Sequence, residues 1–153
     1  MEKLELRVPP ALVALVFATL MYFTARWLPA GSFEFLGRQW LQWALVALAF
    51  LIGLLAVLRF QREGTSLNPH HPEFAGKLVT GGIYYYTRNP MYLSLLLLLL
   101  AWGLYLGNAF NTLVAALFVA FMNRFQIRPE ERVLESRFGA AYRQYCTLVR
   151  RWF

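Results

Sequence analysis

The chain has 153 residues, of which 59% are hydrophobic and 15% charged, and its mean hydropathy is +0.45. This composition excludes an ordinary soluble domain and is typical of an integral membrane protein. The net charge of +7 would also suit a nucleic-acid-binding protein. The placement of the basic residues beside apolar stretches argues against a nucleic-acid partner and favours contact with anionic lipid head groups.

Four apolar stretches predict membrane-spanning helices, at residues 11–28, 40–58, 91–106 and 109–125. A helix crosses about 30 Å of hydrocarbon with about 20 residues, and about 17 is near the lower limit. The last two stretches are short and only Gly107 and Asn108 separate them, so they are predicted to form a tight helical hairpin. A signal peptide is less favoured for the first stretch, because the stretch is long and lacks a following small-residue cleavage site.

The distribution of basic residues predicts the orientation of these four spans. With a cytoplasmic N-terminus, thirteen of the fifteen Lys and Arg residues face the cytoplasm and only Arg26 and Arg38 face outward. This is the asymmetry that the positive-inside rule describes. We therefore expect a single-domain, multi-pass protein of the cell membrane, all-α in fold, with both termini on the cytoplasmic side.

Two segments outside the spans are predicted to meet at that cytoplasmic surface. The loop 59–89 is long for a compact protein, and such loops are more often functional than idle. The tail 129–146 begins with proline and two glutamates, which suit a helix start, and then repeats apolar residues at helical spacing. We expect this tail to be an amphipathic helix that lies on the membrane or folds back over the loop.

Arg88, Asn89 and Pro90 stand at the predicted start of the third span, and two interpretations of Asn89 remain open. Asparagine is a good helix N-cap and proline suits the first helical position, so Asn89 could be only a cap. Alternatively, the free N–H groups of a helix start beside an arginine form an anion site for a carboxylate or phosphate.

Other clusters of polar residues are compatible with either a structural or a ligand-binding role. Glu130 and Glu131 suit a helix start, yet a carboxylate there could also meet an ammonium group. Adjacent helical residues point about 100° apart, so we expect only one of them to face a site. Tyr84, Tyr85 and Tyr86 suit either an interfacial belt or a pocket for a flat ring or a sulfonium cation. His70 and His71 lack the ligand spacing of a metal centre, so no metal is expected.

Two motifs carry a resemblance to a known family. The segment "LVTGGIYYYTRNPMY" is followed about 40 residues later by "PEERVLESRFGAAYRQY". In order and spacing, the pair resembles the isoprenylcysteine carboxyl methyltransferase and phospholipid methyltransferase superfamily. The resemblance covers roughly residues 64–145. Members of that family are membrane enzymes that use S-adenosylmethionine without a Rossmann domain.

The resemblance implies specific roles for residues in both motifs. The implied cofactor-binding residues are Lys77, Leu78, Val79, Tyr84, Arg88, Asn89, Pro90, Met91, Tyr92 and Glu130. Two positions depart from the family pattern: Asn89 replaces a histidine, and Gln126 replaces an arginine that holds the substrate carboxylate. Arg124 and Arg128 are the candidates to substitute for that arginine, and Arg88 and Glu131 are the candidates for a catalytic role.

The resemblance therefore implies methyl transfer from S-adenosylmethionine to a lipophilic acceptor, and the expected topology puts the active site at the cytoplasmic membrane surface. No residue needs to act as a nucleophile in such a reaction, so the lack of a Ser/His/Asp set is no objection. Two alternatives stay open: an NADPH-dependent membrane reductase of related architecture, and a non-catalytic membrane protein on the same scaffold.

Overall fold

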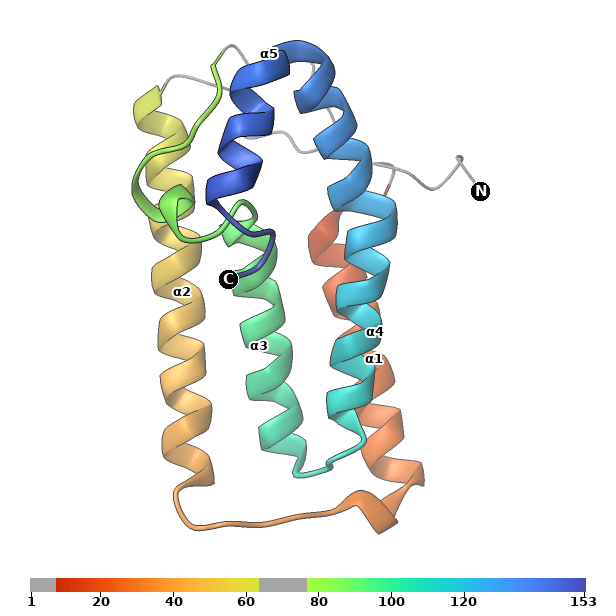
Figure 1. Ribbon diagram of the computed structural model, residues 1–153. Coiled ribbons are helices and arrows are strands. Elements are labelled where there is room, and N and C mark those ends of the chain that lie inside the picture. Colours follow the sequence, from red (N-terminus) through yellow and green to blue (C-terminus); the bar gives the residue numbers. More distant parts are fainter. Residues whose placement is uncertain (1–7, 64–76) are drawn as a thin grey trace.

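The protein is an all-α bundle whose helices stand side by side, with one helix crossing the top (Figure 1). The computed structural model describes residues 8–63 and 77–153. Five α-helices follow in order: α1 Pro10–Trp27, α2 Arg38–Glu63, α3 Pro90–Leu106, α4 Asn111–Met122 and α5 Arg128–Leu148. Within the described residues, extended pairing is limited to one isolated bridge between Ser32 and Asn108. The predicted all-helical class is confirmed.

Helix α3 is the central element, since α1, α2 and α4 all pack against it. The core between these helices contains fully buried side chains from α1 and α4, including Met21, Phe118 and Met122. The outward faces are apolar too: Leu15, Trp40 and other large hydrophobic residues of α1 and α2 are exposed. An apolar exterior around an apolar core suits a helix bundle surrounded by lipid rather than water.

Among the described helices, α1 and α2 are both long and apolar enough to cross a membrane. Helix α3 is also apolar but has 17 residues. Helix α4 has 12 residues, but the helical path continues without a break through the π-helical turn Asn123–Ile127 into α5. The sequence predicted a boundary between span and tail near residue 125, and the backbone shows no interruption there.

The connections at the end of the bundle opposite α5 are bonded to each other. Gly107 ends α3 in the left-handed conformation at φ 61°, where a side chain would be strained. The Phe33 N–H donates to the Gly107 carbonyl at 2.8 Å, and the Ala109 N–H donates to the Gly31 carbonyl at 2.8 Å. The α1–α2 connection thus holds the short α3–α4 hairpin in place.

The tail sequence predicted one amphipathic helix over 129–146, but α5 is interrupted at Gly139. Gly139 has φ 52° and ψ −122°, and the chain reverses there, so that the second arm descends beside the start of α3 (Figure 1). Residues with a Cβ rarely adopt this conformation. The glycine of the motif "FGAAY" therefore forms a turn that splits the helix.

We predict that Gly139→Ala lowers the free energy of unfolding by about 1–2 kcal/mol, the usual cost of a strained backbone conformation. A Cβ at this position would meet nothing within 4 Å, so the backbone alone sets the cost. Thermal unfolding in detergent measures the effect. The exposed neighbour Ala140, changed to serine, is the control and should be nearly neutral. Equal stability of Gly139→Ala and wild type would contradict the turn.

Candidate functional site

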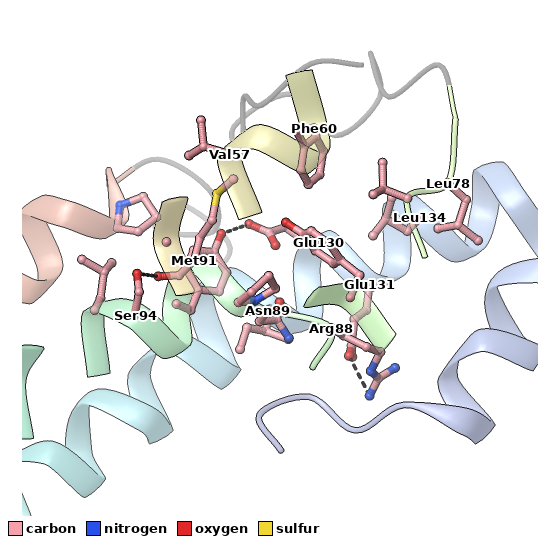
Figure 2. Close-up of a pocket in the computed structure, with 18 of the residues that line it drawn as sticks. Val57, Phe60, Leu78, Arg88, Asn89, Met91, Ser94, Glu130, Glu131 and Leu134 are labelled. Atoms are coloured by element: carbon pink, nitrogen blue, oxygen red, sulfur yellow. Dashed lines mark hydrogen bonds and ion pairs between the residues drawn. The ribbon is translucent and has the colours of Figure 1, made fainter. Parts of the chain in front are cut away.

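A cavity of about 480 Å³ lies where α5 and the Leu78–Asn89 segment cover the start of α3 (Figure 2). Nine of the ten residues that the resemblance implied for the cofactor line it, and these are Leu78, Val79, Tyr84, Arg88, Asn89, Pro90, Met91, Tyr92 and Glu130. The tenth, Lys77, instead forms an ion pair with Glu63 at 2.5 Å and is not part of the lining. The two motifs, distant in sequence, therefore meet around one cavity.

The three residues predicted to hold the acceptor lie outside this lining. Gln126 is fully buried, and its amide nitrogen donates to the Val8 carbonyl at 2.7 Å. Arg124 lies over the Phe125 ring, 5.4 Å from its centroid, and Arg128 is exposed. A buried amide needs a partner, and the backbone before α1 supplies one for Gln126. The structure does not bring this trio to the cavity.

Glu130 is an acid in the cavity with no cationic partner among the described residues. Its carboxylate accepts a hydrogen bond from the Tyr92 hydroxyl (Figure 2). Burial raises the pKa of Glu130 to about 8, and the neighbouring Glu131 charge adds to this, while the Tyr92 bond opposes it. The carboxyl group is therefore mostly protonated at neutral pH, and a cation in the cavity would favour its ionised form.

Glu131 also lines the cavity, but its carboxylate is occupied by two arginines. Arg151 binds both oxygens, with Nε–Oε1 at 2.9 Å and Nη2–Oε2 at 2.7 Å. Arg88 Nη2 lies 3.3 Å from Oε1 (Figure 2). We expected only one of the adjacent glutamates to face the site. Both contact it, but only Glu130 lacks a charged partner.

Asn89 does not cap α3 with its side chain, so the capping interpretation is wrong. Its amide nitrogen instead donates to the Arg151 carbonyl at 3.0 Å. The first N–H groups of α3 are left without a side-chain cap at the edge of the cavity, where an anion can accept from them.

The residues after α5 do not line the cavity but contact three residues that do, Arg88, Asn89 and Glu131, and the sequence did not indicate these contacts. We call Val149–Trp152 the strap. The Arg88 N–H donates to the Arg150 carbonyl at 3.0 Å, and the Thr87 hydroxyl donates to the Arg151 carbonyl at 3.1 Å. Trp152 Nε1 donates to Asn123 at 3.1 Å. The strap therefore joins the start of α3 to the helical turn that precedes α5.

Tyrosines form one wall of the cavity. Tyr84 is buried against Phe60, with ring centroids 5.4 Å apart, and its carbonyl accepts a bond from the Tyr145 hydroxyl at 2.7 Å. Tyr85 and Tyr86 are exposed. Of the three consecutive tyrosines, only Tyr84 faces the cavity, and burial raises its pKa. Tyr84 is therefore neutral and presents an aromatic face.

No group of three His, Cys, Asp or Glu side chains in the part of the chain that the structure describes could hold a metal ion. His70 and His71 lie outside the described residues.

We predict that Glu130 lowers stability as the pH rises. Its folded-state pKa of about 8 exceeds the ordinary value of 4.5, so between these values the folded state binds more protons than the unfolded state. Glu130→Gln cannot ionise. The free energy of unfolding of this variant relative to wild type should therefore rise between pH 5.5 and pH 8.5. The rise should be at least about 1.4 kcal/mol, the free energy that corresponds to a shift of one pKa unit.

Denaturant unfolding of the detergent-solubilised protein at several pH values measures this difference. Glu135→Gln is the matched control, because Glu135 is an exposed acid of α5 that pairs with Arg143 at 3.4 Å. The control should keep the pH slope of wild type. A Glu130→Gln variant with that same slope would contradict the buried, protonated carboxyl group.

Comparison with known proteins identifies the family of the chain. The phospholipid methyltransferase family model matches residues 37–141. A stretch of 62 residues is 56% identical to an uncharacterized protein of Haemophilus influenzae, covering 40% of this chain and 98% of that protein. Another comparison, over 68 residues, gives 40% identity to a protein-S-isoprenylcysteine O-methyltransferase of Schizosaccharomyces pombe, covering 44% of this chain and 29% of that enzyme.

No solved structure gives a significant match. The family model spans more than half of the chain and includes the first motif and most of the second, up to residue 141. The chain belongs to the phospholipid methyltransferase family.

Proposed function

We propose that this protein transfers a methyl group from S-adenosylmethionine to a lipophilic acceptor where the membrane meets the cytoplasm. The observation that carries the proposal is Glu130, a carboxyl group in a largely apolar cavity that has no cationic partner within residues 8–63 and 77–153. Such a group suits a ligand that is itself cationic. Membership of the family supports methyl transfer in general, and the cavity argues for the cofactor.

The residues of the cavity fit the groups of S-adenosylmethionine. Glu130 suits the ammonium group, and Arg88 with the uncapped start of α3 suits the carboxylate. The face of Tyr84 suits the sulfonium cation. The apolar side chains of Leu78, Val79 and Leu134 suit the flat adenine ring. The volume of about 480 Å³ is within the range of sites for small molecules.

When bound, S-adenosylmethionine would supply a methyl group attached to a positively charged sulfur. An electron pair of the acceptor would form the new bond to the methyl carbon, and the electrons of the broken carbon–sulfur bond would remain on sulfur. The protein's task is to hold the two reactants in line. Positioning of this kind contributes about 7–11 kcal/mol. Helix α5 forms one side of the cavity through Glu130, Glu131, Leu134, Tyr142 and Tyr145. Of the two catalytic candidates, Arg88 binds a reactant, and Glu131 forms ion pairs with Arg88 and Arg151.

The acceptor is proposed to enter from the bilayer side. There the cavity extends along α3 past Ser94 and Leu95, with Gly53 and Val57 of α2 opposite. A Cβ on Gly53 would lie 3.3 Å from Ser94 Oγ, so the glycine preserves room between the two helices. We propose that the chain of the acceptor is held by these apolar contacts, and not by Gln126, Arg124 or Arg128.

We also propose four membrane spans with both termini and the cavity on the cytoplasmic side. Helices α3 and α4 are the shorter spans, and the helical path from Asn111 to Ile127 extends α4 through its π-helical turn. The first arm of α5 and its return after Gly139 then lie at the cytoplasmic surface. The thirteen basic residues expected on that side support this orientation.

The alternatives are weaker. An NADPH-dependent reductase would need a site for several phosphates, and in the described part of the cavity lining Arg88 is the only basic side chain. A non-catalytic scaffold leaves the unpaired Glu130 without a role. Family membership also favours a methyltransferase over both.

We predict that purified protein transfers a labelled methyl group from S-adenosylmethionine into the organic phase of a membrane lipid extract. Glu130→Gln should weaken cofactor binding by roughly ten- to a hundredfold, the value of a charge-assisted hydrogen bond. Glu131→Gln should weaken it less, because Glu131 binds arginines. Calorimetry gives the affinities. A folded wild-type protein that neither binds nor transfers would refute the proposal.

The proposed topology predicts opposite labelling at two exposed positions. Leu36 lies in the α1–α2 connection and Thr147 near the end of α5. On intact cells, an impermeant maleimide should label Leu36→Cys, and it should label Thr147→Cys only after permeabilisation. Each variant is made in a Cys146→Ala background. Labelling of both positions from the same side would rule out the orientation.

A further inference from the structure

The strap and Arg88 meet at Glu131, and the charges there do not balance. One carboxylate is shared by two guanidinium groups, with Arg151 bidentate and Arg88 at 3.3 Å. The cluster therefore keeps one unit of positive charge. Arg88 lines the cavity and Arg151 does not, so the uncompensated charge is available to a ligand through Arg88.

The geometry favours Arg151 as the main partner of Glu131. Parallel double hydrogen bonds between arginine and a carboxylate are stronger and more specific than a single contact. Hydrogen bonds from Thr87 and Asn89 to the Arg151 carbonyl fix its backbone. If Arg151 were absent, Glu131 would have only Arg88 as a partner, and the pair would be neutral.

We infer that Arg151 is a positioning residue that gives the site its preference for a ligand bearing a carboxylate. It takes up the charge of Glu131, so that the guanidinium of Arg88 can bind an anionic group beside the start of α3. This inference rests on the proposed function. It concerns the carboxylate of the ligand, whose binding Arg151 affects through Glu131 and Arg88. The Arg151 side chain itself does not contact the ligand.

A simpler role for Arg151 would be to hold the strap in place. The two roles differ in one respect. Loss of a purely structural contact weakens binding of all ligands of the cavity alike. Loss of charge compensation weakens the binding of the carboxylate-bearing ligand only. A second substitution that removes the Glu131 charge should restore that binding.

The experiment compares S-adenosylmethionine with its decarboxylated analogue by calorimetry on the full-length protein in detergent. Wild type should bind the carboxylate-bearing ligand more tightly. Arg151→Gln should reduce that preference roughly tenfold, the order expected for one unit charge at a partly buried site. Arg151→Lys should retain most of the preference. The double variant Arg151→Gln/Glu131→Gln should restore it, because Arg88 is again uncompensated.

Arg150→Gln is the matched control, since Arg150 is exposed and the strap uses only its carbonyl. It should leave the preference unchanged. An equal loss of affinity for both ligands in Arg151→Gln, or no recovery in the double variant, would overturn the inference while leaving the proposed function standing. A folded wild type that binds neither ligand would overturn both. If Arg151→Gln does not fold, the double variant and Arg151→Lys still test the charge balance.

Discussion

The reversal of the chain at Gly139 is the constraint on which the candidate site depends. Helix α5 continues from α4 and would otherwise lead away from the bundle. With φ 52° at Gly139, the second arm returns, so that Tyr142 and Tyr145 pack against Leu78 and the strap bonds to the residues just before α3. These contacts close one side of the cavity and place Arg151 beside Glu131. A single backbone conformation thus connects the end of the chain to residues some sixty positions earlier.

The two adjacent glutamates illustrate how similar residues acquire different roles from their surroundings. Glu131 has two arginine partners and is part of the framework that holds the strap. Glu130 has a tyrosine hydroxyl and no arginine or lysine among the described residues, so burial raises its pKa to about 8. Burial of an acid without a counter-charge lowers stability, and such costs are typical of sites that bind a charged ligand. The central claim is that this ligand carries its own positive charge.

Much of the site could be predicted from the sequence because its residues lie in two compact motifs. The apolar stretches and the helical spacing of the tail predicted the helices, and the resemblance predicted nine residues that line one cavity. The strap was missed because Arg150 and Arg151 look like ordinary basic residues of a membrane surface. Only the turn at Gly139 gives them a different environment. A glycine inside a predicted helix was the available signal, since glycine is unfavourable there unless it forms a turn.

The errors have equally specific causes. Asn89 precedes a proline at a helix start, which is the usual sequence pattern of a cap, but the strap carbonyl takes its amide nitrogen. The resemblance placed Gln126, four residues before Glu130, at the position of an arginine that holds the substrate carboxylate. Its side chain is instead bound to the backbone before α1, a contact between residues 118 positions apart that no local pattern encodes.

The most direct test of the central claim is a structure of the protein in a lipid mesophase with S-adenosylhomocysteine, the product that S-adenosylmethionine leaves after methyl transfer. The account predicts that the ammonium group lies within hydrogen-bond distance of Glu130, with the carboxylate at Arg88 and the start of α3. It also predicts an opening toward the bilayer between α2 and α3, beside the sulfur. A nucleoside bound outside this cavity, or one with its amino-acid group directed away from Glu130, would contradict it.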